Sequence, residues 1–160
     1  MNLVKHIDQY EEECVYFGDP IKNNVMPDGF FIRIIYSTPT FILNGINLYI
    51  TLNDINLEKY YNKYKCFFNN NTLHHKKNLE NIQKIEENLL KKINIPNKIK
   101  NYKIYDQLKS GNIKFFLENN NNEINIINYF LLKISGIWET ETHYGLTYKF
   151  VKIKSSISIK

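Results

Sequence analysis

A period of two in hydrophobicity, repeated in segments along most of the chain, constrains the fold more than any other feature. The segment 30–37 (FFIRIIYS) is rich in β-branched and aromatic residues, and the segment 144–153 (YGLTYKFVKI) alternates larger apolar with smaller or polar side chains. Successive side chains of a β-strand point to opposite faces of a sheet, so this pattern is typical of strands with one face against a core. We therefore predict a mainly β protein.

Turn-forming residues separate the predicted strands. Asn44-Gly45 is the commonest two-residue hairpin turn, or else marks a bulge, inside the apolar segment 41–52. The segments 129–138 and 144–153 are joined by the polar residues 139–142, which predicts a closing hairpin. The predicted strands, with 57–68 as a single strand, are 14–18, 30–37, 41–52, 57–68, 113–117, 129–138 and 144–153.

One long helix is predicted among these strands. From 73 to 94 an apolar stripe at helical spacing lies opposite Lys and Glu, and it consists of Leu79, Ile82, Ile85, Leu89 and Ile93. Pro96 ends it, and a second short helix is predicted over 102–109. The predicted class is mainly β with one long helix (α+β), an OB-fold-like antiparallel barrel with the helix between the third and fourth core strands. A different α+β barrel or a sandwich would give the same pattern.

The chain of 160 residues has the size of one domain. We assign an acidic segment to 1–13, a single OB-like domain to 14–154 and a basic tail to 155–160. Cys14 and Cys66 make no disulfide framework and fit a reducing compartment. The acidic start differs from an apolar export signal, and no apolar run approaches the ~18 residues of a membrane span. We expect an intracellular protein that is not secreted and binds no membrane.

Charge is distributed unevenly along the chain. Residues 1–19 hold five acidic side chains and one lysine, a local charge of −4, so the formal net charge of +5 leaves +9 over residues 20–160. A basic body favours polyanionic partners. The composition offers another explanation, because 24 Asn, 24 Ile, a single Arg (Arg33) and no Ala are typical of an AT-rich genome, as in a large DNA virus or an intracellular parasite. Lysine codons are AT-rich too, so codon usage alone would also make the chain basic.

The sequence contains no familiar catalytic or cofactor-binding motif. The phosphate-loop, dinucleotide, nucleophile-elbow and H-E-x-x-H patterns do not occur in it. His74 and His75 would point about 100° apart on a helix, so we predict exposed side chains at its start and no shared metal ion. Cys66 is predicted to pack as a small hydrophobe, and Glu139 and Glu141 to lie in a solvated turn. We predict no enzyme activity, no metal and no cofactor.

Lysines interleaved with aromatic residues are the most informative binding feature. Single-stranded nucleic acid binds where cations meet its phosphates and flat rings stack on its bases. We predict a groove on one β face, out of phase with the aliphatic residues, which contains Phe31, Arg33, Tyr49, Lys59, Tyr61, Lys63, Lys65 and Lys149. The alternative is that the aromatic rings fill a β core and that Arg33 makes a structural ion pair. Trp138 is in phase with Phe130, Leu132 and Ile134, which favours core packing.

Three segments carry a resemblance to known proteins: FILNGINL, LEKYYNKYKC and LLKISGIWETETHYGLTYKF. Over most of residues 14–153 they resemble a family of small proteins from giant DNA viruses of algae and amoebae. The last segment is also similar to the end of OB-fold single-stranded DNA-binding proteins of phages and large viruses, where Trp138, Tyr144, Gly145 and Phe150 would match motif positions. Phage-type members end in an acidic, aromatic-tipped tail. This sequence ends in the basic KIKSSISIK, which puts recruitment through a tail in doubt.

The resemblance implies a non-enzymatic protein that coats single-stranded DNA exposed in replication or recombination. It would act in the cytoplasmic virus factory or the nucleus of an infected host, with self-association or a replication-machinery partner. Two alternatives stay open. One is a structural or protein-interaction component, either in the virion or toward the host, and the other is an RNA-binding accessory of viral transcription or translation.

Overall fold

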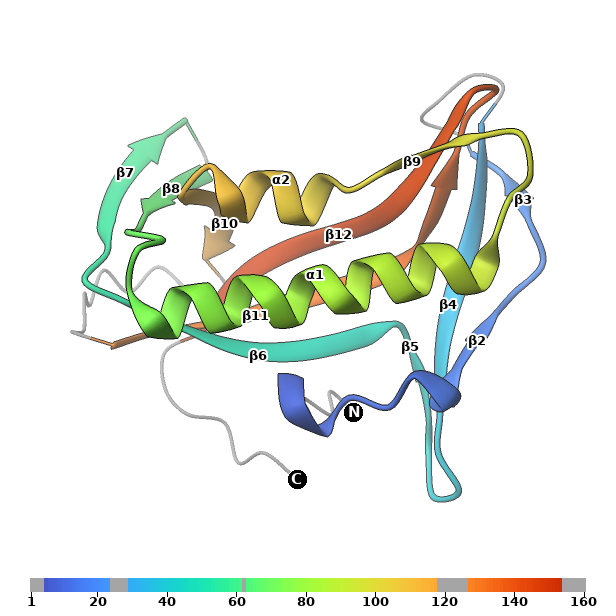
Figure 1. Ribbon diagram of the computed structural model, residues 1–160, viewed down its shortest axis with the longest axis horizontal. Coiled ribbons are helices and arrows are strands. Elements are labelled where there is room, and N and C mark those ends of the chain that lie inside the picture. The colour runs from blue at the N-terminus through green and yellow to red at the C-terminus, as the bar shows by residue number, and fades with distance from the viewer. Residues whose placement is uncertain (1–4, 24–28, 62, 118–126, 154–160) are drawn as a thin grey trace.

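The computed structural model describes residues 5–23, 29–61, 63–117 and 127–153, and Figure 1 shows one long helix lying across a large sheet. The helices are α1 (Leu73–Ile93) and α2 (Lys103–Lys109), with two 3-10 turns at Ile7–Gln9 and Glu12–Cys14. The strands are β1 (Lys5–His6), β2 (Val15–Phe17), β3 (Ile21–Lys22), β4 (Phe30–Ser37), β5 (Ile42–Asn44), β6 (Ile46–Asn53), β7 (Asn56–Tyr60), β8 (Lys63–Phe67), β9 (Ile99–Asn101), β10 (Asn112–Leu117), β11 (Ile127–Glu139) and β12 (His143–Ile153). The protein is therefore mainly β with helices, as predicted.

The closing hairpin of β11 and β12 is the centre of the sheet. β11 pairs with β6 through its first half and with β4 through its second half. The change of partner falls at a β-bulge between Ile134 and Gly136. β12 pairs in parallel with β10 near its end and with β9 near its start. The predicted hairpin is confirmed, and it joins the two halves of the sheet.

The sheet is open. Over the described residues its main path runs β1-β6-β11-β12-β10-β8-β7, and these ends do not pair with each other. The predicted antiparallel barrel is not confirmed, and the segment 57–68 gives one reason. Tyr61 has a left-handed backbone (φ 53°), and the turn there divides the predicted single strand into the hairpin of β7 and β8. The sheet consequently ends on the five-residue β7 at this end, and its other end is the two-residue β1.

The long helix covers one side of the sheet, which we call the helix face; the opposite side is the outer face. Thr72 caps α1 by accepting a hydrogen bond from the His75 amide at 3.3 Å. The predicted stripe is confirmed, since Ile82, Ile85 and Leu89 are buried in the main core with sheet residues such as Leu48, Phe130 and Phe150. Neither described helix has the length and apolar composition needed to cross a membrane.

The bulge in β11 reverses the alternation of its side chains. Ile134 and Ile137 both lie in the main core, whereas Trp138 lies opposite Phe31 and Gly145, on the outer face. The prediction that Trp138 shares a face with Phe130, Leu132 and Ile134 is therefore wrong, because an extra residue shifts a period of two by one. The indole is still only 9% exposed. Gly145 leaves room for it, and the Lys103 Nζ atom lies 4.5 Å from its ring centroid.

A second, smaller apolar cluster lies on the outer face. It consists of Tyr49, Leu131, Val151 and Ile153, with Tyr129 packed against it. The Tyr49 ring stacks on Tyr129 at 5.6 Å between centroids and meets the His6 ring edge-on at 5.3 Å. Tyr49 is only 7% exposed, so the expectation of an exposed ring on a polar strand face is wrong.

Candidate nucleic-acid interface

Four lysines on neighbouring strands form a row across the outer face. Lys133 of β11 is opposite Lys149 of β12, and Lys114 of β10 is opposite Lys65 of β8. β10 and β12 run parallel with Phe115 opposite Phe150. The residues that precede them, Lys114 and Lys149, are therefore neighbours as well. Since strands lie about 4.8 Å apart, the row extends roughly 15 Å across the strands. We call these four residues the lysine row.

The lysine row brings like charges together on adjacent strands, with Lys133 opposite Lys149 and Lys114 opposite Lys65. The ion pair of Lys98 with Glu139 lies outside the row. Glu58 lies opposite Lys65 and ends the row on β7. Lys114 and Lys149 are exposed, and the other two are half-buried. Like charges directly opposite each other destabilise a sheet, so an anion laid along the row would relieve this repulsion.

An open depression of about 410 Å³ adjoins the β11 end of the lysine row, and we call it the outer-face depression. Its side chains include two ammonium groups, two amides and two hydroxyls, from Lys133, Lys149, Asn44, Asn47, Ser135 and Thr147. Asn47 is opposite Lys133, so it continues the row onto β6. The bulge residue Ser135 donates a hydrogen bond to the Thr147 carbonyl at 3.3 Å.

Most residues of the predicted groove do lie on the outer face. Lys63 and Lys65 of β8 and Lys149 of β12 are there, on positions that alternate with the buried Cys66 and Phe150. Phe31 and Arg33 of β4 alternate with the buried Ile32 and Ile34. Arg33 is opposite Gly136, which is in turn opposite Thr147 of the depression. The structure therefore places five of the eight predicted residues on one surface with accessible or half-buried side chains.

The other three predicted residues are placed differently. Tyr49 is on the outer face but buried in the second cluster. Lys59 is opposite Tyr64, which packs against the main core, so Lys59 belongs to the helix face. Tyr61 is in the turn between β7 and β8 and is 82% exposed. The turn at Tyr61 explains both differences on this segment, because it reverses the chain where a straight strand was predicted.

Sequence reasoning missed Lys114 and Lys133, two members of the lysine row. Each is the polar residue between two apolar neighbours, Ile113 and Phe115 for Lys114, and Leu132 and Ile134 for Lys133. That alternation was visible in the sequence and marks both lysines as facing away from the core. Their position beside Lys65 and Lys149 was not visible, because it depends on the register of β10 and β11 with their neighbours.

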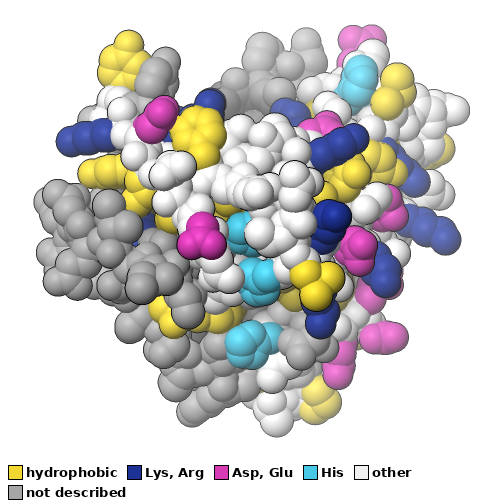
Figure 2. All heavy atoms as spheres, turned by 60° about the vertical axis from the view of Figure 1, so that its left-hand side comes forward, with side chains coloured by type: hydrophobic (Ala, Val, Ile, Leu, Met, Phe, Trp, Pro, Cys, Tyr) yellow, Lys and Arg dark blue, Asp and Glu magenta, His cyan; other side chains and the backbone are white. Residues whose placement is uncertain are grey.

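Three histidines lie beside β6: His6 is opposite Tyr49, His74 bonds to Thr51, and His75 bonds to Asn53. Figure 2 shows histidine side chains close together on this side of the molecule. His75 is buried, so its predicted exposure is wrong. The Asn53 amide donates to Nε2 at 3.0 Å, and Nδ1 donates to the Asn69 carbonyl at 2.6 Å. Both ring nitrogens of His75 are thus hydrogen-bonded to backbone groups. Over the described residues no three His, Cys, Asp or Glu side chains converge as metal ligands would.

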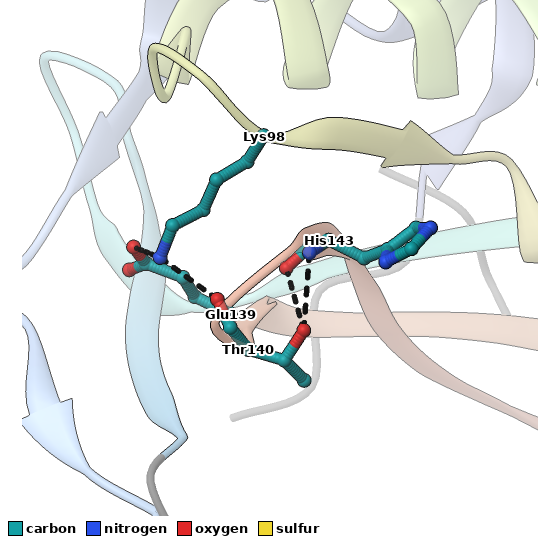
Figure 3. Close-up of polar contacts among 4 residues, drawn as sticks. All are labelled: Lys98, Glu139, Thr140 and His143. Atoms are coloured by element: carbon teal, nitrogen blue, oxygen red, sulfur yellow. Dashed lines mark hydrogen bonds and ion pairs between the residues drawn. The ribbon is translucent and has the colours of Figure 1, made fainter.

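The turn between β11 and β12 has a structural role. Glu139 is half-buried and pairs with Lys98 at 2.5 Å, and Lys98 also donates to the Thr140 carbonyl at 2.8 Å (Figure 3). Thr140 and His143 close the turn through a backbone hydrogen bond of 2.8 Å. The prediction of a solvated turn is wrong for Glu139, while Glu141 is exposed. Cys66 is fully buried, as predicted, and burial raises the pKa of its thiol to about 12, so no reactive thiolate forms there.

Comparison with known protein families, with curated proteins and with solved structures found no match for this chain. The resemblances to viral proteins therefore stay predictions, and the functional argument depends on the geometry of the outer face.

Proposed function

We propose that the protein is a non-enzymatic single-stranded DNA-binding protein that holds the strand across the outer face of its sheet. In the setting that the sequence suggests, a large DNA virus would use it to coat strands exposed in replication or recombination. The observation that carries the proposal is the lysine row, Lys133, Lys149, Lys114 and Lys65 on four adjacent strands. Their shared partner would be a chain of phosphates, because one polyanion can meet all four.

Aromatic rings near the row favour a single strand over a duplex. The Phe67 ring lies 5.1 Å from the Lys65 Nζ atom on the same face of β8, and the exposed Tyr61 ring is at the end of that hairpin. Unpaired bases can stack on such rings, whereas bases inside a duplex cannot. The proposal takes one feature from the expected OB-fold, the presentation of lysines and aromatic rings by β-strands. An open sheet can present them in the same way.

A salt-titrated binding assay tests the proposal. Oligonucleotides of dT, of U and of duplex DNA, equal in length and labelled with a fluorophore, would be compared by anisotropy. Four lysine–phosphate contacts predict a slope of about −3 on the log–log salt plot for a single strand. Tighter binding to dT than to duplex supports the proposal. Tighter binding to U would favour the RNA-binding alternative, and no binding at low salt would overturn both.

Lys149→Glu should change binding and stability in opposite directions. It removes one phosphate contact, so affinity for dT should fall and the salt slope should become shallower by about 0.7. It also replaces a repulsive pair with Lys133 by an attractive one, which should raise the free energy of unfolding by up to about 1 kcal/mol. Lys77→Glu, the same charge change at an exposed position of α1, is the matched control and should bind almost as the wild type does. Equal losses in both variants would mean that net charge, not the row, governs binding.

A second candidate function, a protein-interaction component, is favoured by exposed apolar side chains on the strands that pair with β4. Tyr16, Ile21 and Ile42 are more than half exposed, at 57%, 56% and 73%. They belong to β2, β3 and β5, which all pair with β4. The hairpin of β4 and β5 extends away from the helices (Figure 1). Retained folding with no nucleic-acid binding at low salt would favour this function.

A further inference from the structure

The outer-face depression contains chemistry that phosphate binding does not use. Phosphate oxygens accept hydrogen bonds, and the ammonium groups of Lys133 and Lys149 can only donate them. The amides of Asn44 and Asn47 can also accept, and so can the hydroxyl of Thr147. A phosphate would use only the donors of these groups, whereas a nucleobase, which presents donors together with acceptors on its edges, could also donate to their oxygens.

The size of the depression agrees with a larger group than a phosphate. The depression is open to solvent, and its volume of about 410 Å³ leaves room for more than a phosphate group. Its position is also suitable, because Asn47, Lys133 and Lys149 are in register across β6, β11 and β12. A single strand of DNA that follows the lysine row would therefore pass from the ammonium groups of Lys149 and Lys133 directly to the amide of Asn47.

The depression forms where two irregular backbone segments meet, the corner at Gly45 and the bulge in β11. Gly45 has a left-handed φ of 88° at the corner between β5 and β6, and a Cβ atom there would lie 2.7 Å from the Ile134 carbonyl oxygen. That close approach brings Asn44 up to the β11 bulge, where Ser135 interrupts the ladder. The amides and the lysines are therefore held together by rigid strands.

We infer that the outer-face depression is a nucleotide subsite, in which Lys133 and Lys149 hold a phosphate while Asn44 and Asn47 contact the base. The inference rests on the proposed binding of a single strand and deepens it. A protein that only coats strands would bind all homopolymers alike apart from stacking. This subsite instead makes affinity depend on the base through hydrogen bonds.

The test compares dA, dC and dT homopolymers of equal length with the wild type and with Asn44→Ala and Asn47→Ala. Asn88→Ala, at an exposed position of α1, is the matched control. We expect the wild type and the control to share one ranking of the three homopolymers. In Asn47→Ala the preferred homopolymer should lose about 3- to 10-fold in affinity, the effect of one net hydrogen bond, and the least preferred should change little. Thermal melts establish that each variant is folded. If Asn47→Ala did not fold, Asn44→Ala would still test the subsite.

The outcomes separate the subsite from the proposed function. A ranking that the asparagine variants flatten supports the subsite. Two outcomes overturn the subsite and leave strand binding in place. In one, both variants bind all homopolymers with the wild-type ranking; in the other, they lose the same affinity for each homopolymer. No binding of any homopolymer at low salt overturns the proposed function and the subsite together.

Discussion

At the scale of single residues, two tyrosines near opposite ends of the strand order have opposite roles. Tyr49 is 7% exposed and packs against Tyr129 and Leu131, while Tyr61 is 82% exposed. Tyr49→Ala should therefore lower the free energy of unfolding by about 3 kcal/mol, as expected for truncating a buried aromatic ring. Tyr61→Ala should leave it within about 0.5 kcal/mol and weaken single-strand binding by about 1–3 kcal/mol through lost stacking.

Chemical unfolding and anisotropy measured on both tyrosine variants check this difference. The Tyr49→Ala protein, once folded, should bind dT nearly as the wild type does. If Tyr61→Ala bound normally and Tyr49→Ala did not, the second cluster rather than the β7–β8 turn would be the stacking surface.

At the scale of elements, a buried carboxyl group links the two helices. Glu86 of α1 accepts hydrogen bonds from the amides of Ile104 and Tyr105 at 3.0 and 2.9 Å, and so holds the first turn of α2. Burial raises the pKa of Glu86 to about 7, with smaller contributions from Asp106 and Glu87. The folded protein thus binds this proton more tightly than the unfolded chain, where the pKa is about 4.5. The resulting stabilisation is complete below about pH 4.5 and is lost as pH rises to about 7.

Urea unfolding of the wild type and of Glu86→Gln between pH 4.5 and 8 measures this linkage. The free energy of unfolding of the wild type relative to the variant should fall by up to about 3 kcal/mol over that range and then stay level. Glu87→Gln, at the exposed neighbouring position, leaves both hydrogen bonds of Glu86 in place and should keep the wild-type fall. A difference between wild type and Glu86→Gln that is constant with pH would contradict the assignment.

At the scale of the whole molecule, β11 holds the two halves of the sheet together at Gly136. A Cβ atom at this position would lie 2.4 Å from the Ile32 carbonyl oxygen and 2.5 Å from the Phe31 ring. Gly136→Ala should therefore push β4 away from β11 and destabilise the protein by about 3 kcal/mol, in the upper range for overpacking. Gly18→Ala is the control, because its Cβ atom would meet the nearest atom at 3.6 Å, an ordinary contact. Calorimetry of both variants checks the prediction, which fails if the two melt alike.

The local elements could be predicted from the sequence. The strand at 30–37 is β4 with the same bounds, α1 covers the predicted 73–94 to within a residue, and the closing hairpin is present. Each of these depends on residues two to four positions apart, whose spacing the sequence displays directly. The outward direction of Lys65 and Lys149 followed from the same alternation. The chain by itself therefore determined where most strands and helices form and which side chains of a regular strand leave the core.

Only the tertiary structure decided which elements are neighbours. Lys65 and Lys114 are opposite each other although they lie 49 positions apart in the sequence, because β8 and β10 pair across the intervening helices. The bulge before Gly136 moved Trp138 to the outer face, and the second cluster buried Tyr49. Strand register is set by packing between distant segments, and one inserted residue exchanges the two faces of everything that follows it. The lysine row and the outer-face depression exist only through such long-range pairings, so no local pattern could have specified them.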